Sequence, residues 1–231
     1  MEKKHKPHIK AIIFDMDGTI IDSMHLWQLA SKKVLENRGI TNPPAHYQKE
    51  VENILSLKEW ALITKQLLGI EDSSNLLVQE LKVIVQTHFR ASAKYINGFE
   101  NFHAQITALN IPTGVATNCE LQTLAVISSQ LQFSNLFGTH VYSFEHAENK
   151  PKPDPAVFLH AAKMLGFDPS ECLVFEDSLH GFRAAKAAGM MCVAVRNKKN
   201  HHLMDEVNHF IDDYAEALKT INHLIISDTQ K

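Results

Sequence analysis

The sequence is short of cysteine, of net charge and of long apolar runs, and each shortage excludes a class of protein. Its three cysteines, Cys119, Cys172 and Cys192, form no CxxC pair, which argues against a disulfide framework or a cysteine zinc site and fits a reducing cytosol. Lysine and arginine number 23 against 26 aspartates and glutamates, so the net charge of −3 provides no basic footprint for nucleic acid. No stretch approaches the ~20 apolar residues of a membrane-spanning helix, and the apolar run after the basic start is too short for a secretory signal. We expect a cytoplasmic monomer or weak dimer with no nucleic-acid or membrane partner.

What the chain does contain is an alternation of short apolar runs with segments of helical periodicity. Its 231 residues, 45% of them hydrophobic, are enough for a substantial core. The apolar runs have the length of strands buried on both faces, as in a parallel sheet, and they span residues 9–14, 112–116, 139–142, 172–175 and 191–195. Helical spacing occurs between them at residues 121–131, 155–165 and 181–188. This alternation predicts an α/β fold built on a parallel sheet.

Residues 23–94 differ from the rest, because apolar residues recur there at helical spacing without a strand-like run. Two groups of helix breakers, residues 39–44 and 69–75, divide the segment into three or four predicted helices. A helical block inserted after the first strand predicts two domains. These are an α/β core of residues 1–22 plus 95–231 and an all-α domain of residues 23–94.

Side chains suited to metal and phosphate chemistry come directly after three of the predicted strands. They are Asp15 and Asp17 after the first, Thr117 and Asn118 after the second, and Glu176 and Asp177 after the fourth. Because the carboxyl ends of parallel strands lie on one edge of the sheet, we expect these side chains to converge on one crevice. Crowded carboxylates repel one another unless they are neutralised, most simply by a divalent cation. Ligands that are all oxygen favour Mg²⁺.

A lysine in a proline-rich loop adds a positive charge to this pattern. Both Lys150 and Lys152 stand in a Lys-Pro-x-Pro sequence, and the prolines stiffen the loop before the helix predicted from residue 155. A lysine and Mg²⁺ that face a carboxylate are suited to phosphoryl transfer, for which aspartate is an established nucleophile.

Taken in order, these residues resemble the four motifs of the haloacid dehalogenase-like (HAD) superfamily: Asp15-Met16-Asp17-Gly18-Thr19, Thr117-Asn118, a lysine before Pro-x-Pro, and Glu176-Asp177. The stretch 173–190 resembles the β-phosphoglucomutase-like phosphatase branch of that superfamily. The resemblance covers residues 9–22 and 95–211. It implies a Rossmann-like catalytic core, with the helical segment 23–94 as a cap domain.

The resemblance also implies which residues carry out catalysis. Asp15 would be the nucleophile, and Asp17 the general acid that protonates the leaving oxygen and then activates water. Lys152 would bind phosphate and steady Asp15; its spacing from residues 158–166 favours it over Lys150.

The binding residues are implied in the same way. Thr117 and Asn118 would hold the phosphoryl oxygens. The Mg²⁺ ligands would be Asp15, the backbone carbonyl of Asp17, and Asp177, with Glu176 as a further partner.

The function implied is a Mg²⁺-dependent phosphatase for small phosphorylated metabolites, such as sugar or polyol phosphates, that works through a phospho-aspartate. A β-phosphoglucomutase, which would return the phosphoryl group to the sugar, is the alternative enzyme. Thr117-Asn118 stands where mutases tend to carry Ser-Ala-Ser, which favours the phosphatase. A signalling receiver domain is a third hypothesis, but Asp17 and the helical insertion argue against it.

The remaining features receive structural interpretations. The 14 histidines are scattered without the spacing of a zinc site and are interpreted as solvated surface residues. Gly181 and the alanines after it are expected to let a helix approach the sheet closely. Residues 196–199 are expected to form a solvated basic loop near the rim of the crevice.

Overall fold

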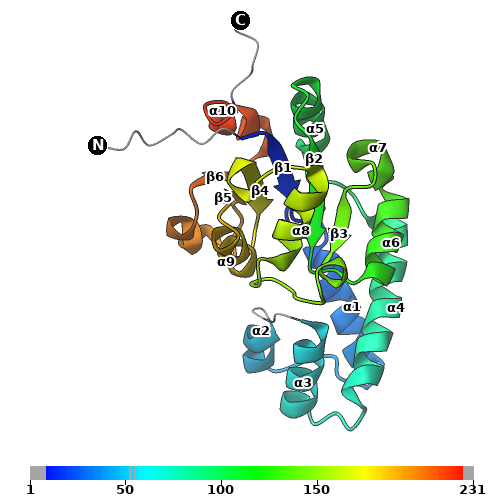
Figure 1. Ribbon diagram of the computed structural model, residues 1–231. Coiled ribbons are helices and arrows are strands. Elements are labelled where there is room, and N and C mark those ends of the chain that lie inside the picture. The colour runs from blue at the N-terminus through cyan, green and yellow to red at the C-terminus, as the bar shows by residue number, and fades with distance from the viewer. Residues whose placement is uncertain (1–8, 52–53, 55, 226–231) are drawn as a thin grey trace, which may run out of the picture. The chain divides into compact units, whose positions relative to one another are not determined.

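The computed structural model describes residues 9–51, 54 and 56–225, and the chain divides into two compact units (Figure 1). The α/β unit consists of Met1–Asp22 and Lys94–Lys231. The helical unit consists of Ser23–Ala93.

A six-stranded sheet forms the centre of the α/β unit. Its strands are β1 (Ala11–Phe14), β2 (Thr113–Thr117), β3 (Val141–Ser143), β4 (Cys172–Glu176), β5 (Met191–Val195) and β6 (His209–Ile211). They lie in the order β3-β2-β1-β4-β5-β6, and all neighbouring strands pair in parallel. The central strands β2, β1 and β4 are buried along their whole length, as the continuous apolar runs predicted. The predicted α/β fold with a parallel sheet is confirmed.

The edge strand β6 is the one that the apolar runs did not predict. It has three residues, and Phe210 in its middle is 42% exposed, so no buried run marks it in the sequence. Its register is set by β5, where Val195 pairs with Ile211.

Helices cover both faces of this sheet (Figure 1). They are α5 (Phe99–Ala108), α6 (Leu121–Gln130), α7 (Phe133–Phe137), α8 (Ala156–Leu165), α9 (Leu179–Ala187) and α10 (Ala217–Ile221). Helices α8 and α9 share a core with Ile13 and Val174 on one face. Successive side chains of a strand point to opposite faces, so Phe14 lies on the other face, where its ring centroid is 5.3 Å from those of Phe99 and Phe175.

The helical unit has its own apolar interior. Its described helices are α1 (Met24–Glu36), α2 (Ala45–Val51), α3 (Leu57–Leu68) and α4 (Ser74–Ser92). Trp27 of α1 meets Phe89 of α4 edge to face at 5.9 Å. Gly69 ends α3 with a φ of 66°, a left-handed conformation that glycine adopts without strain. Among the described helices, none combines the length and the hydrophobicity that crossing a bilayer requires.

The two chain segments that lead into and out of the helical unit are paired within the α/β unit. Ile21 forms an antiparallel bridge with Tyr95, and the backbone N–H of Asp22 donates to the carbonyl of Lys94 at 3.1 Å. The helical unit therefore leaves and re-enters the α/β unit at adjacent points of the backbone.

Candidate active site

The carboxyl ends of β1 and β4 bring three carboxylates together at one edge of the sheet. Asp15 directly follows β1, and its backbone N–H donates to the carbonyl of Phe175 at 2.9 Å. Glu176 ends β4, and Asp177 follows it. One carboxylate oxygen from each of Asp15, Glu176 and Asp177 lies within 4.8 Å of the others. We refer to these three residues as the acidic cluster.

Lys152 places its ammonium group inside the acidic cluster. Its Nζ donates to Asp15 Oδ1 at 2.6 Å and to Glu176 Oε1 at 2.9 Å, and the residue is 3% exposed. The Phe158 ring lies 4.4 Å from Nζ and covers it on a further side. Lys150, the other lysine that the motif allows, pairs with Glu148 at the protein surface. The structure thus brings Lys152, and not Lys150, to the carboxylates.

Thr117 and Asn118 lie at the same edge of the sheet, and both side chains bond to the backbone. Asn118 Oδ1 accepts from the backbone N–H of Lys152 at 2.8 Å, and Asn118 Nδ2 donates to the carbonyl of Lys152 at 3.2 Å. The hydroxyl of Thr117 accepts from the backbone N–H of Cys119 at 3.0 Å. Asn118 therefore fixes the backbone from which Lys152 extends, a contact that the motif resemblance does not imply.

Both oxygens of Glu176 are engaged by groups of the protein. Oε1 bonds to Lys152, while Oε2 accepts from the backbone N–H groups of Asp177 and Ser178, at 2.7 and 2.6 Å, and from the Ser178 hydroxyl at 3.0 Å. Gly181 faces this carboxylate so closely that a Cβ there would overlap the carboxyl group of Glu176. We expected a glycine at position 181 to let the helix approach the sheet closely. The structure shows what requires the glycine: the Glu176 carboxyl group occupies the space that a Cβ would fill.

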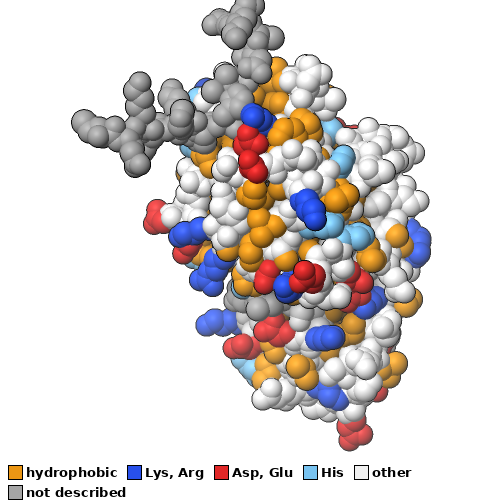
Figure 2. Space-filling model, in the orientation of Figure 1, with side chains coloured by type: hydrophobic (Ala, Val, Ile, Leu, Met, Phe, Trp, Pro, Cys, Tyr) orange, Lys and Arg blue, Asp and Glu red, His pale blue; other side chains and the backbone are white. Residues whose placement is uncertain are grey.

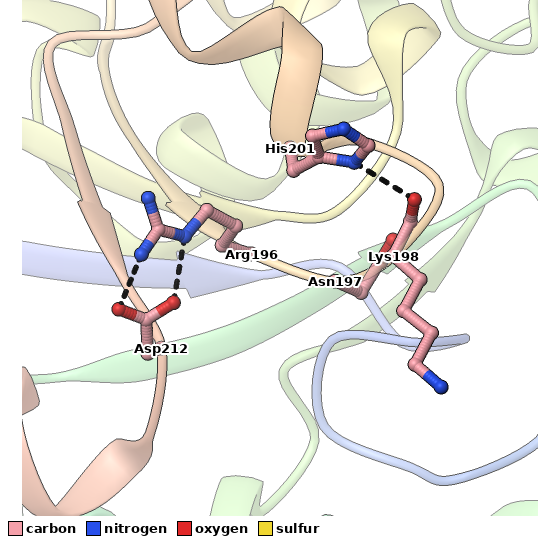
Figure 3. A pocket seen from close by; sticks show the side chains of 5 residues that line it. All are labelled: Arg196, Asn197, Lys198, His201 and Asp212. Carbon is pink, nitrogen blue, oxygen red and sulfur yellow. Dashed lines mark hydrogen bonds and ion pairs between the residues drawn. The ribbon is translucent and has the colours of Figure 1, made fainter.

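Asp177 is fastened by residues beyond β5 that the motif analysis did not identify. Asn197 Nδ2 donates to Asp177 Oδ2 at 3.2 Å, and Asn200 Nδ2 donates to the backbone carbonyl of Asp177 at 2.7 Å. Asn197 also lines a pocket of about 340 Å³ with Arg196, Lys198, His201 and Asp212 (Figure 3). Only their position in the sequence could have pointed to these residues: they follow β5, a strand parallel to β4 that ends at the same edge of the sheet.

The electrostatics of the cluster are those of crowded, desolvated charges. Burial raises the pKa of Asp15 to about 7, with help from the charges of Glu176 and Asp17 and against the attraction of Lys152. The pKa of Asp177 is raised well above its usual range, first by burial and then by the charges of Glu176 and Asp15. Burial alone would lower the pKa of Lys152, but its two carboxylate partners raise it instead, so the lysine is charged.

The donor set fits a divalent cation with hard oxygen ligands. One buried ammonium faces the three acidic side chains of the cluster, so the site carries surplus negative charge. A Cβ at Gly18 would overlap the Asp177 carboxylate, which shows how closely the Asp17–Gly18 turn approaches the cluster. On the face of the molecule that Figure 2 shows, acidic, basic and hydrophobic side chains are interspersed. Mg²⁺, which takes a few carboxylates and keeps several waters, suits such a site.

Comparisons with known proteins agree with this geometry. The model of the family described as haloacid dehalogenase-like hydrolase matches residues 12–195. YhcW of Bacillus subtilis is 31% identical over 90% of this chain and 93% of its own. Fructose-1-phosphate phosphatase YqaB of Escherichia coli is 27% identical over 80% of this chain and 95% of its own. The crystal structure of CbbY from Rhodobacter sphaeroides in complex with phosphate superposes with a TM-score of 0.79 at 20% identity, over 94% of this chain and 99% of that one. At that identity the likeness concerns the fold alone.

Proposed function

The chain belongs to the haloacid dehalogenase-like hydrolase family and is a phosphatase, and we propose that it hydrolyses small phosphorylated metabolites with Mg²⁺ through a phosphorylated Asp15. The family match confirms the resemblance drawn from the four motifs. Sugar or polyol phosphates are the proposed substrates, because YqaB is named for a sugar phosphate. The observation that carries the proposal is the burial of the Asp15–Lys152 pair against Glu176 and Asp177.

Three groups of this chain would hold Mg²⁺: Asp15, Asp177 and the backbone carbonyl of Asp17. When bound, the ion offsets negative charge on the phosphoryl oxygens. Glu176 is proposed to position Lys152 rather than to touch the metal, because its oxygens already accept four hydrogen bonds.

The reaction is proposed to proceed in two displacements at phosphorus. The Asp15 carboxylate forms a bond to phosphorus as the ester P–O bond breaks, and Asp17 gives its proton to the leaving alcohol oxygen. Asp17 then takes a proton from water, whose oxygen attacks the phosphorus of phospho-Asp15; the P–O bond to Asp15 breaks, which releases inorganic phosphate and restores the Asp15 carboxylate. Lys152, whose Nζ lies 2.6 Å from Asp15 Oδ1, is proposed to favour the ionised form of Asp15, to orient it and to neutralise a phosphoryl oxygen.

Thr117 and Asn118 are proposed to serve the phosphoryl group from the second loop. Thr117 would contribute its hydroxyl, whose oxygen accepts from Cys119 and whose hydrogen remains to donate. Asn118 would act chiefly through the Lys152 backbone that it holds.

The helical unit, Ser23–Ala93, is proposed to act as a cap that selects the substrate, while the α/β unit carries the chemistry. Exclusion of bulk water during turnover would follow from closure of such a cap.

The experiment that tests the mechanism combines two variants and metal removal with turnover of para-nitrophenyl phosphate. Asp15→Asn should abolish Mg²⁺-dependent turnover, and EDTA should do the same to the wild type. Asp17→Asn should slow dephosphorylation, so that mass spectrometry of the protein detects a phosphorylated form. A fully active Asp15→Asn variant would exclude Asp15 as nucleophile, given the roughly 10²–10⁴-fold effects that such groups usually contribute.

Lys152→Ala and Lys150→Ala form a matched pair within one loop. Lys152→Ala should cripple turnover, because it leaves two buried carboxylates without their cation. Lys150→Ala should leave turnover unchanged, because Lys150 pairs with Glu148 at the surface. A panel of phosphorylated metabolites that includes β-glucose 1-phosphate with a bisphosphate activator separates the phosphatase from a mutase.

A further inference from the structure

The loop after β5 holds Asp177 both by its carboxylate and by its main chain. We call residues 196–201 the asparagine loop. Asn197 bonds to Asp177 Oδ2 at 3.2 Å, and Asn200 bonds to the Asp177 carbonyl oxygen at 2.7 Å. One loop on the neighbouring strand therefore restrains both the side chain and the backbone of a member of the acidic cluster.

Hydrogen bonds within the asparagine loop orient these two amides. Asn197 Oδ1 accepts from the backbone N–H groups of Lys199 and Asn200, at 2.8 and 3.1 Å. Asn200 Oδ1 accepts in return from the backbone N–H of Asn197 at 2.8 Å. Since the oxygen of Asn197 is held by two backbone donors, its Nδ2 is directed at Asp177 by the loop itself.

The ends of the asparagine loop are anchored to the sheet. Asn200 is 2% exposed and donates to the carbonyl of Val195, the last residue of β5, at 2.9 Å. Arg196 makes two bonds of 2.6 Å to Asp212 and lies over the Phe210 ring. Figure 3 shows Arg196 turned to Asp212, while the Lys198 side chain points away from that pair.

We propose that Asn197 and Asn200 are positioning residues that hold the Asp177 carboxylate in the orientation that Mg²⁺ binding requires. This inference rests on the proposed function, in which Asp177 is a ligand of the metal. A carboxylate that is already ordered loses little freedom when it binds a cation, and hydrogen-bond partners of metal ligands affect metal affinity roughly 10–100-fold. The asparagine loop would thereby set how much Mg²⁺ the enzyme needs.

Two substitutions at Asn197 separate the amide donor from the turn that its oxygen stabilises. A serine hydroxyl can accept from the Lys199 N–H and preserve the turn, but it is too short to reach Asp177. Asn197→Ala removes both interactions. Lys199→Ala is the matched control, because it shortens an exposed side chain of the same loop and keeps the backbone donor.

The readouts are calorimetric titration of the metal-free protein with Mg²⁺, thermal unfolding without metal, and the Mg²⁺ dependence of para-nitrophenyl phosphate turnover. We expect Asn197→Ser and Asn197→Ala to raise the Kd for Mg²⁺ roughly tenfold or more, and Lys199→Ala to stay within about twofold of the wild type. At saturating Mg²⁺ the kcat of Asn197→Ser should return close to the wild-type value, which a general loss of structure would not allow.

The inference is overturned if Asn197→Ser binds Mg²⁺ as tightly as the wild type, even where Asn197→Ala does not, because the turn would then be the cause. It is overturned equally if kcat stays low at saturating Mg²⁺. Asp177→Asn distinguishes this failure from that of the proposed function. Wild-type Mg²⁺ affinity in Asp177→Asn removes Asp177 as a ligand, whereas lost affinity there beside an unaffected Asn197→Ser refutes the positioning role alone.

Discussion

Lys152 carries a charge into a place from which water is almost entirely excluded. The residue is 3% exposed, and its ammonium group is stable there because Asp15 and Glu176 bond to it directly. Removal of one member of such a buried pair typically costs about 3–5 kcal/mol, because the other charge is left without a partner. The residues proposed to carry out the chemistry therefore also affect stability, so measurements of activity need a parallel measurement of stability.

Gly181 provides a prediction in which two effects have opposite sign. Alanine is a better helix former than glycine by about 1 kcal/mol, so propensity alone would make Gly181→Ala stabilise α9. A Cβ at this position overlaps the Glu176 carboxyl group, and overpacking of that kind costs roughly 1–3 kcal/mol. We expect Gly181→Ala to lower the free energy of unfolding and to reduce kcat by displacing Glu176 from Lys152.

Urea denaturation and steady-state kinetics of Gly181→Ala measure both effects. Arg183 is exposed in the same helix, so the difference in stability between Arg183→Gly and Arg183→Ala measures the effect of helix propensity without overpacking. A Gly181→Ala variant that is as stable and active as the wild type would show that Glu176 has room to move.

The raised pKa of Asp15 predicts that Mg²⁺ affinity depends on pH. With a pKa of about 7 in the metal-free protein, the carboxyl group holds a proton that Mg²⁺ must displace. The apparent Kd for Mg²⁺ should therefore rise as the pH falls below about 7, by about tenfold per pH unit for each proton released. Titration calorimetry in buffers of different ionisation enthalpy counts those protons. An affinity that is constant from about pH 8 to about pH 5.5 would contradict the prediction.

The raised pKa of Asp15 also predicts how the stability of the metal-free protein depends on pH. Between the ordinary pKa of 3.8 and about 7, the folded protein retains a proton that the unfolded chain has released. The protonated carboxyl group therefore contributes to the free energy of unfolding fully below the ordinary pKa, and this contribution is lost as the pH rises to about 7. Added Mg²⁺ should offset the loss, because it binds the ionised form.

At the scale of elements, the candidate site is built at the carboxyl ends of neighbouring strands, with Lys152 added from the segment between β3 and α8. β1 leads to Asp15, β2 to Thr117 and Asn118, β4 to Glu176 and Asp177, and β5 to Asn197. These four strands are neighbours in the sheet. Parallel pairing therefore assembles the site from segments that are distant in sequence, as is general for open α/β sheets.

The N-cap of α9 belongs both to a helix and to the site. Ser178 accepts from the backbone N–H of Gly181 at 3.1 Å, and its hydroxyl donates to Glu176 at 3.0 Å. Ser178→Ala should cost about 1 kcal/mol of stability, as removal of an N-cap usually does. It should also lower kcat, because one of the donors that hold Glu176 is lost.

Ser73→Ala is the matched control for this prediction, because Ser73 caps α4 of the helical unit through the N–H of Leu76 at 3.2 Å. Chemical denaturation should show a similar loss of stability for both variants, with kcat for para-nitrophenyl phosphate reduced in Ser178→Ala alone. Equal kinetics in the two variants would mean that the Ser178 bond to Glu176 has no bearing on turnover.

At the scale of the whole molecule, the α/β unit contains a complete sheet, and the two ends of the helical insertion meet within it. The backbone N–H of Asp22 donates a hydrogen bond to the carbonyl of Lys94 at 3.1 Å. Because these two residues are so close, a short linker can replace Ser23–Ala93 without stretching the chain. We expect the shortened protein to fold and to bind Mg²⁺ with its own acidic cluster. It should lose preference among phosphorylated metabolites, because the proposed cap is gone.

Circular dichroism, Mg²⁺ titration and kcat/KM over a panel of phosphate esters test this dissection. Retained discrimination in the shortened protein would assign substrate choice to the α/β unit. Loss of Mg²⁺ binding in a protein that is still folded would show that the helical unit supports the metal site.

Sequence patterns by themselves determined the parallel sheet and the residues at its carboxyl edge. Continuous apolar runs mark β1, β2 and β4 because these strands are buried on both faces. The position of Asp15 and Asp177 follows from chain direction alone, since parallel strands end on one side. The sequence did not predict β6, because an edge strand of three residues that is partly exposed has no continuous apolar run.

Only the tertiary structure decided which lysine enters the acidic cluster, what Asn118 holds, why residue 181 is glycine and how the asparagine loop reaches Asp177. Each of these depends on hydrogen bonds or contacts between side chains and backbone groups brought together by folding. Periodicity and motif spacing report which face of an element is buried and where a strand ends. They contain no distances between separate loops, and those distances determine which groups can bond.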